Sequence, residues 1–228
     1  MSEKKCGFIL INKPVGPTSH DIISKLRKIT GMKKIGHAGT LDPFASGLLI
    51  VAIGREATKR IDQFVKQDKE YVAKLQLGAI SDSHDLTGKI VESDKPRVPA
   101  EDEIKKVLLK FIGELEQIPP MFSAKKVAGK KLYKLARKGE VVERQPSLIN
   151  VYGIEVLKYQ WPVLELKVKC STGTYVRVLA YNIGTALGCG AYLTQLQRTK
   201  IGDYDIKKAV ALEQLTADNW QAFLFFNA

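Results

Sequence analysis

Residues 36–49 read GHAGTLDPFASGLL, and this stretch places one carboxylate, that of Asp42, in a turn rich in glycine. Pro43 restricts the residue before it to extended geometry. Three further positions permit a positive φ or a close approach of another backbone segment: Gly36, Gly39 and Gly47. An acidic side chain on an ordinary surface loop needs no such restriction, because solvent accepts it in many backbone conformations. We therefore expect this turn to hold Asp42 in one direction.

The segments around the turn show the periodicities of both helices and strands. Ser19 can cap a helix that Gly31 ends, and Leu48–Ile53 is a continuous apolar run typical of a buried strand. Further helices are predicted over 56–65, 101–112 and 174–187, and further strands over 7–11, 70–78, 148–157, 163–170 and 191–197. This order predicts an α+β fold with a central mixed, mostly antiparallel sheet flanked by helices. We expect one domain over 1–212, followed by a C-terminal helix over 213–228.

The charge of the chain favours a polyanionic partner. It has 228 residues, with 36 Lys and Arg against 24 Asp and Glu, which gives a net charge of +12. An excess of this size is typical of nucleic-acid-binding proteins, although basic surfaces also serve solubility. Residues 125–144 carry eight lysines and arginines against two glutamates, within a segment spanning about 118–146. A solvated helical face is one interpretation, and an RNA-binding insertion that neutralises phosphates is the other.

The cysteines and histidines predict neither disulfides nor a metal site. Cys6, Cys170 and Cys189 are far apart and odd in number, as expected for free thiols in a reducing compartment. Three histidines without suitable neighbours give no zinc-binding spacing. No stretch approaches the roughly 18 apolar residues of a membrane span, and no secretory signal begins the chain. We expect a cytoplasmic protein that does not associate with membranes.

Two nucleotide-related motifs are excluded or disfavoured by their details. Residues 31–36 match the glycine spacing of a P-loop, but His37 and Ala38 stand where that motif needs Lys and Ser or Thr. In SDSHDLTG, Asp82 and Asp85 flank His84, yet a hydrogen-bonded Asx-rich turn explains this pattern better than a metal cluster. A covalent role for Asp42 without metal remains open. Burial would raise the pKa of such a carboxylate, so a fixed cation is required, and Arg177 near a predicted helix start is the candidate.

Five blocks of sequence resemble the TruB family of tRNA pseudouridine synthases. GHAGTLDPFASGLLIVAIGREATK is similar to the catalytic motif of that family, and INKPVGPTSHDII to its N-terminal Lys-Pro motif. DKEYVAKLQLGAISDSHDLTGKI resembles its tyrosine-bearing strand and turn, and IPPMFSAKKVAGKKLYKLARKG its RNA-binding insertion. CSTGTYVRVLAYNIGTALGCGAYLTQLQRTKIG resembles its arginine and leucine motifs. The blocks span most of residues 9–202 in the order that the family has them, so we expect the pseudouridine synthase fold.

The resemblance implies roles for individual residues. Asp42 corresponds to the catalytic nucleophile, Arg177 to the arginine that pairs with it, and Tyr71 to the tyrosine that stacks on the target base. His37 corresponds to the histidine that occupies the space left by the flipped nucleotide. Other positions implied to bind substrate are Lys13, Tyr175, Leu196 and, in the insertion, Lys125, Lys126, Lys130 and Lys131. Core packing is the alternative for Tyr71, Tyr175 and Leu196, and solvation for Lys13.

The implied reaction converts the T-loop uridine at tRNA position 55 to pseudouridine after base flipping. It needs no cofactor and no metal, and the implied partner is the T-arm of tRNA. Full-length members of the family continue into a PUA-type domain, which we expect to be absent after residue 212. A monomer is expected, because no apolar patch or heptad indicates assembly. A tRNA-folding chaperone without catalysis and a synthase acting on another RNA remain alternatives.

Overall fold

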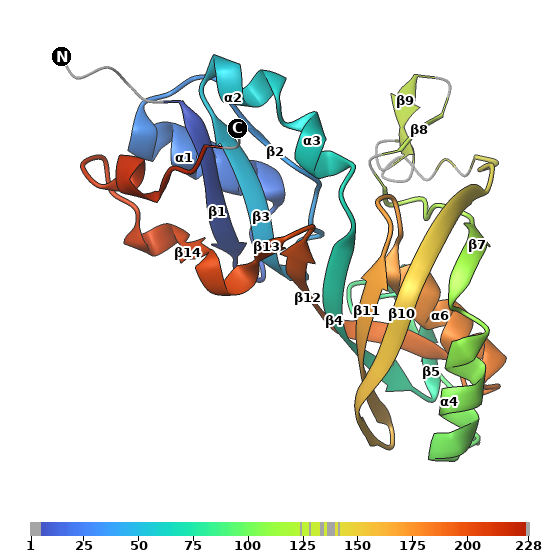
Figure 1. The fold of residues 1–228 in the computed structure, drawn as a ribbon. Helices are drawn as coiled ribbons and strands as arrows, with labels where there is room; N and C mark the ends of the chain where they lie inside the picture. Colours follow the sequence, from blue (N-terminus) through green and yellow to red (C-terminus); the bar gives the residue numbers. More distant parts are fainter. Residues whose placement is uncertain are drawn as a thin grey trace. The chain divides into compact units, whose positions relative to one another are not determined.

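The computed structural model describes residues 6–123, 125–127, 129–132, 135, 140 and 142–226, with the backbone alone for 126, 127, 130 and 131. The chain divides into two compact units (Figure 1). The first comprises Met1–Tyr71 with Gln197–Ala228, and the second comprises Val72–Leu196. Strands β4 (Lys69–Leu77) and β12 (Ala191–Ile201) contribute residues to both units. The single domain expected over 1–212 therefore stays a prediction.

The first unit is organised around two long antiparallel strands. β1 (Gly7–Lys13) pairs with β3 (Ser46–Ile53) along its whole length. β12 joins β3 in parallel beside Ser46 and Gly47. Three short strands complete this part of the sheet, with β2 on β3, β13 on β12 and β14 parallel to β1: β2 (Ile35–His37), β13 (Tyr204–Asp205) and β14 (Val210–Ala211). The sheet is therefore mixed, as the sequence predicts.

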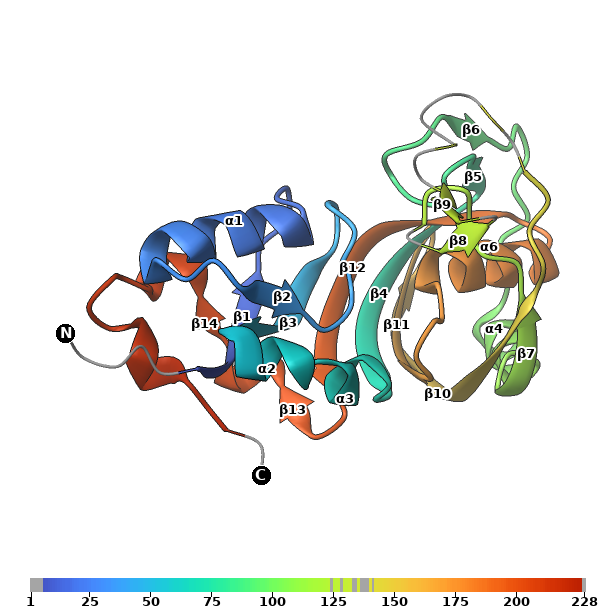
Figure 2. The same cartoon turned by 90° about the horizontal axis from the view of Figure 1, so that it is seen from above.

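Apolar residues cover both faces of β1 and β3, which explains their uninterrupted apolar sequences. One face packs under α1 (Ser19–Thr30), and the other under α2 (Arg55–Lys59) and α3 (Asp62–Val65), as Figure 2 shows. The α1 face includes Ile9, Ile11, Ile22, Ile23, Leu26, Leu49, Val51 and Trp220. The opposite face includes Phe8, Leu10, Leu48, Ile50, Ala57 and Phe64. These strands are consequently rigid supports for the loops at their ends.

The helix α1 begins with a different cap from the predicted one. Thr18, and not Ser19, is the N-cap residue: its hydroxyl accepts the Asp21 N–H at 3.0 Å, and the Asp21 carboxylate accepts the Thr18 N–H at 2.9 Å. This reciprocal capping box satisfies two backbone donors at once. Gly31 ends the helix with a φ of 65°, as predicted. Ser19 is thereby the first helical residue, and its hydroxyl is available for a contact outside the helix.

Two other predicted helices differ in the structure. The one over 56–65 is divided into α2 and α3, because bonds between residues three apart, such as Arg60 N–H to Ala57 O at 3.1 Å, tighten the chain between them. The C-terminal helix over 213–228 is replaced by short 3₁₀ turns, η2 (Leu212–Gln214) and η3 (Trp220–Phe223). A third turn, η1 (Ile206–Lys208), precedes β14. After η3 the chain is extended, since Phe225 exchanges two backbone hydrogen bonds with Phe8 of β1.

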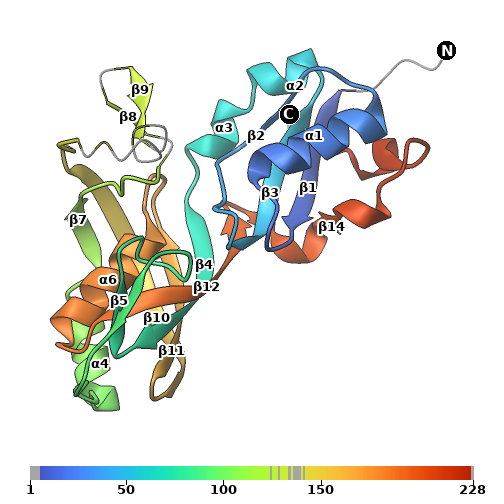
Figure 3. The ribbon, with the colours of Figure 1, turned by 180° about the vertical axis from the view of Figure 1, so that it is seen from behind.

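The second unit contains an antiparallel set of strands with helices on one face. Within it, β11 (Val163–Cys170) lies between β4 and β10 (Ser147–Gln160), and β7 (Gly113–Gln117) lies at the edge. α6 (Val176–Ala186) lies behind β10 and β11 in Figure 1 and in front of them in Figure 3, close to α4 (Glu101–Leu109). Two hairpins complete the unit: β5 (Ala79–Ser81) with β6 (Ile90–Glu92), and β8 (Lys126–Val127) with β9 (Lys130–Lys131). The predicted α+β class is confirmed.

Candidate active site

The Asp42 loop connects β2 to β3 in the first unit. Asp42 is half-buried and begins a turn in which its carbonyl oxygen accepts the Ala45 N–H at 3.1 Å. Leu41 before it and Phe44 after it are buried, so apolar side chains hold the loop to the core on both sides of the carboxylate. The backbone of the loop is fixed at several further points, which are described next.

Two contacts from the N-terminal part of the chain hold the backbone beside Asp42. The hydroxyl of Ser19 accepts the Leu41 N–H at 2.9 Å and donates to the Leu41 carbonyl at 3.2 Å. The N–H of Gly16 donates to the Pro43 carbonyl at 2.8 Å. The residues before and after Asp42 are thus both anchored by hydrogen bonds to their backbones.

Arg198 of β12 anchors the remaining ends of the loop. Its guanidinium donates to Leu48 O at 2.8 Å and to Gly39 O at 3.2 Å, and the side chain is 1% exposed. Gly39 and Gly47 have φ values of 96° and 109°, so these two glycines are required as predicted. At Gly36 φ is not positive, and a β-carbon there would make ordinary contacts at 3.6 Å. The prediction that Gly36 constrains the backbone was therefore wrong.

Positive charge surrounds this loop within the first unit. Lys13 is fully buried, and its ammonium donates to Pro14 O and Pro17 O, both at 2.8 Å. Burial lowers the pKa of Lys13 to about 8, against the opposite influence of the Asp42 carboxylate. Burial, followed by the charge of Arg198, also lowers the pKa of His37, so the imidazole is neutral at pH 7. The alternative of a solvated Lys13 is excluded, and the lysine supports the segment that contacts Pro43.

Sequence reasoning did not identify Arg198 or Gln117. Arg198 could have been found, because the alternation of buried residues along β12 places it on the buried side of the strand. A charged residue at such a position needs partners, and here they are the carbonyl oxygens of Gly39 in the Asp42 loop and of Leu48 in β3. Gln117, whose side chain binds the backbone N–H and carbonyl of Tyr175, is at the end of β7, where no local pattern distinguishes it.

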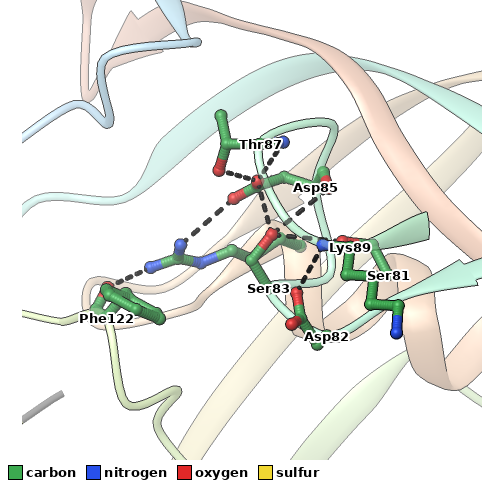
Figure 4. Close-up of polar contacts among 8 residues, drawn as sticks. Ser81, Asp82, Ser83, Asp85, Thr87, Lys89 and Phe122 are labelled. Atoms are coloured by element: carbon green, nitrogen blue, oxygen red, sulfur yellow. Dashed lines mark hydrogen bonds and ion pairs between the residues drawn. The ribbon is translucent and has the colours of Figure 1, made fainter. Parts of the chain in front are cut away.

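Arg177 lies in the second unit and forms a buried ion pair with Asp85 (Figure 4). The Arg177 Nη1 is 3.2 Å from Asp85 Oδ2, and Nη2 donates to the carbonyl oxygen of Phe122. The other Asp85 oxygen accepts from Ser83 Oγ at 2.8 Å and from the N–H and hydroxyl of Thr87 at 2.9 and 2.5 Å. These bonds confirm that SDSHDLTG is an Asx-rich turn. Since Asp42 belongs to the first unit, its pairing with Arg177 stays a prediction.

The turn that contains Asp85 packs against α6 through the ring of His84. His84 has a φ of 64° and its imidazole stacks on Tyr181 of α6, with ring centroids 4.3 Å apart. Burial, and then the positive charge of Arg177, lower the pKa of His84.

In the part of the chain that the structure describes, no three His, Cys, Asp or Glu side chains come together in a metal-binding arrangement. Within that same part, no helix is long and apolar enough to cross a membrane.

Tyr175 and Lys125 border a cavity of about 290 Å³ in the second unit. Tyr175 is the N-cap residue of α6, and the Gln117 side chain binds both its N–H, at 2.7 Å, and its carbonyl, at 3.1 Å. Lys125 contacts the hydroxyl of Ser147 across the lining. The cavity is lined by Gln117, Pro119, Lys125, Ser147, Leu148, Ile149, Thr172, Gly173 and Tyr175. The side chains of Lys126, Lys130 and Lys131 lie outside the described residues, although their backbones form the β8–β9 hairpin.

The remaining two predicted site residues are on the strands that contribute to both units. Tyr71 is a buried residue of β4, with 9% of its surface exposed. Leu196 is a buried residue of β12, with 8% exposed. Their burial agrees with core packing as well as with a pocket wall, so their substrate-binding roles stay predictions.

Family profiles match nearly the whole chain. Residues 27–176 match the N-terminal domain of the TruB family pseudouridylate synthases, and residues 177–223 match the tRNA pseudouridylate synthase B C-terminal domain. A tRNA pseudouridine synthase B of Protochlamydia amoebophila is 50% identical over 90% of this chain and 77% of its own length. The protein of the same name from Chlamydia felis is 48% identical, over 92% of this chain and 88% of its own length.

Solved structures show the same similarity at the level of the fold. A chain of a Cbf5-Nop10-Gar1 complex matches 94% of this chain with a TM-score of 0.72 and 33% identity. A chain of an H/ACA RNP bound to a substrate RNA containing 2'-deoxyuridine matches 95% with a TM-score of 0.69 and 31% identity. The chain spans about half the length of these two relatives, 55% in each case. The protein belongs to the TruB family of pseudouridylate synthases.

Proposed function

We propose that this enzyme isomerises the T-loop uridine at tRNA position 55, with Asp42 as the essential catalytic group. Family membership and the relatives named tRNA pseudouridine synthase B make the chain a tRNA pseudouridine synthase, which is an isomerase. The observation that carries the finer proposal is the Asp42 loop. Its backbone is fixed by Ser19, Gly16 and Arg198 around one half-buried carboxylate, and such restraint serves aimed chemistry.

The reaction exchanges one glycosidic bond for another within the same nucleotide. The N1–C1′ bond breaks, the uracil rotates, and C5 bonds to C1′; C5 loses its proton and N1 gains one. Atoms and electrons balance without an oxidant, a reductant or ATP. Three alternative routes use the Asp42 carboxylate. In the first it attacks C1′ as uracilate departs, in the second it removes a sugar proton to give a glycal, and in the third it adds to C6 of the uracil. Each of these routes needs an ionised carboxylate in a fixed direction.

Cations keep the carboxylate ionised in this proposal. Lys13 is close enough to Asp42 for the two charges to interact, and the guanidinium of Arg198 donates to the carbonyl oxygen of Gly39 in the same loop. Arg177, which forms an ion pair with Asp85, is in this proposal also the arginine that pairs with the Asp42 carboxylate. Tyr71 stacks on the flipped uracil, and His37 fills the space that the nucleotide leaves. Tyr175 and Leu196 line the pocket for the base.

The proposed substrate contact is with the T-arm of tRNA, and the enzyme acts as a cytoplasmic monomer. Base flipping costs about a few kcal/mol, which contacts to the phosphates and stacking offset. The basic segment over about 118–146 supplies the cations, among them Lys125, Lys126, Lys130 and Lys131. The net charge of +12 supports this assignment, because it favours association with RNA generally.

The test is tritium release from [5-³H]uridine in an unmodified tRNA and in its isolated T-arm hairpin. We expect release from both RNAs with the wild-type enzyme and none with Asp42→Asn, whose affinity for tRNA stays within about twofold because the substitution is nearly isosteric. Turnover by pure Asp42→Asn would refute the role of Asp42. Tight tRNA binding without release by the wild type would indicate an RNA-folding chaperone, and release from another RNA alone would move the substrate assignment.

A further inference from the structure

Ser19 makes two hydrogen bonds that its own helix does not need. α1 is capped by Thr18, whose hydroxyl and backbone N–H form the capping box with Asp21. The Ser19 hydroxyl is instead directed out of the helix, to the N–H and the carbonyl of Leu41, a residue 22 positions later in the chain. Ser19 is 2% exposed and Leu41 is 3% exposed, so these bonds form away from water.

The two bonds fix the peptide groups on both sides of the Leu41 Cα atom. The second of these peptide groups is the one that leads directly into Asp42, so its orientation, together with the φ angle of Asp42, sets the direction of the Asp42 Cα–Cβ bond. The other backbone hydrogen bonds described beside it are at Gly39, held by Arg198, at Pro43, held by Gly16, and within the turn itself, from the Ala45 N–H to the Asp42 carbonyl. Without the Ser19 hydroxyl, the segment between these anchors would lose the restraint next to the carboxylate.

We propose that Ser19 is a positioning residue for catalysis, which acts by holding the Leu41 backbone so that the Asp42 carboxylate meets the flipped uridine. This inference rests on the proposed role of Asp42. Ser19 touches neither substrate nor the reacting atoms in this account. Its effect is confined to the geometry of the loop, where a displacement of about 1 Å can cost on the order of 100-fold in rate.

The chain offers a matched control at the other end of the same helix. Thr30 is buried, its hydroxyl donates to Leu26 O at 2.8 Å and it accepts the Met32 N–H at 3.1 Å. It therefore makes the same two kinds of bond as Ser19, but to the C-terminal turn of α1 and not to the Asp42 loop. Thr30→Val removes this hydroxyl with little change in shape, as Ser19→Ala removes the other.

The experiment compares wild type, Ser19→Ala, Thr30→Val and Asp42→Asn by single-turnover tritium release, tRNA affinity and thermal unfolding. We expect both hydroxyl variants to unfold at lower temperature, because each removes two hydrogen bonds between a buried hydroxyl and the backbone. Only Ser19→Ala should turn over about 10- to 100-fold more slowly, with tRNA affinity within about twofold of the wild type. A rate for Ser19→Ala equal to that of Thr30→Val would overturn the proposal.

A second variant at position 19 and the two reference proteins complete the experiment. If Ser19→Ala does not fold, Ser19→Cys replaces it, since the thiol is similar in size and forms weaker hydrogen bonds. We then expect a rate between those of the wild type and a loop without the restraint, and an unchanged rate contradicts the proposal. An inactive wild type or an active Asp42→Asn would count against the proposed role of Asp42 itself. If the wild type is active and Asp42→Asn is not, the rate of the Ser19 variant alone decides whether Ser19 positions the loop.

Discussion

Replacing Gly47 by alanine tests the account of how the Asp42 loop is joined to β12. Gly47 has a φ of 109°, and a β-carbon there would lie 2.3 Å from the carbonyl oxygen and 2.7 Å from the nitrogen of Arg198. Both are backbone atoms of a paired strand, so neither can rotate away. The shorter distance is well below the 3.0 Å limit that real β-carbons keep. Alanine at 47 therefore requires β3 and β12 to separate locally.

The expected cost has two parts. Holding a residue other than glycine at this φ costs about 1–3 kcal/mol. Forcing an extra carbon between packed strands costs about 1–3 kcal/mol. The sum is about 2–6 kcal/mol, and its middle value of about 4 kcal/mol corresponds to a fall in Tm of about 8–16 °C for a chain of this length. Activity should fall as well, because Arg198 also anchors Gly39.

The assay is thermal unfolding followed by circular dichroism, with Gly36→Ala as the control. Gly36 is in the same motif, but its β-carbon would make ordinary contacts with Ile61 and Thr58 at 3.6 and 3.7 Å. We expect the Tm of Gly36→Ala to stay near that of the wild type. A Tm for Gly47→Ala within about 2 °C of the wild type would refute the reasoning, since it would mean that the strands accommodate the side chain freely.

Three further predictions concern charge. The pKa of Lys13 is about 8 in the folded protein and 10.5 ordinarily, so between these pH values the unfolded state binds more protons than the folded state. In urea denaturation at pH 7–10, the free energy of unfolding should therefore rise with pH more steeply for the wild type than for Lys13→Met. Asp85→Ala leaves a buried Arg177 without its ion pair and should cost about 3–5 kcal/mol in the same assay, whereas Asp82→Ala, at an exposed side chain, should cost under about 1 kcal/mol; equal losses would contradict this. In tRNA binding measured at several salt concentrations, replacing Lys130 and Lys131 together by alanine should reduce the magnitude of the slope of log K against log[salt] by about 2. Replacing Lys105 and Lys106 of α4 should leave that slope unchanged, and equal slopes for the two double variants would show that the insertion does not contact RNA.

The local patterns of the sequence predicted the elements that local physical chemistry controls. The apolar run over Leu48–Ile53 became a strand buried on both faces, and the polar turn after β5 became an Asx-rich turn. Gly39 and Gly47 were identified from their place beside Asp42, because only glycine tolerates the backbone geometry of such a turn. The family resemblance added the implied chemistry of the site, which no periodicity contains.

The tertiary structure decided which side chains hold the Asp42 loop and what each polar group binds. Thr18 and Ser19 are adjacent and chemically similar, and only packing shows that the first caps α1 while the second binds Leu41. Arg177 and Asp85 are 92 residues apart, so no short pattern reveals their ion pair. The sequence by itself determined most of the helices and strands, although not the 3₁₀ turns at the C-terminal end, and it determined which carboxylate stands in a constrained turn. Partners distant in the chain are selected by the burial of polar groups that must find a hydrogen bond, and that selection exists only in the folded molecule.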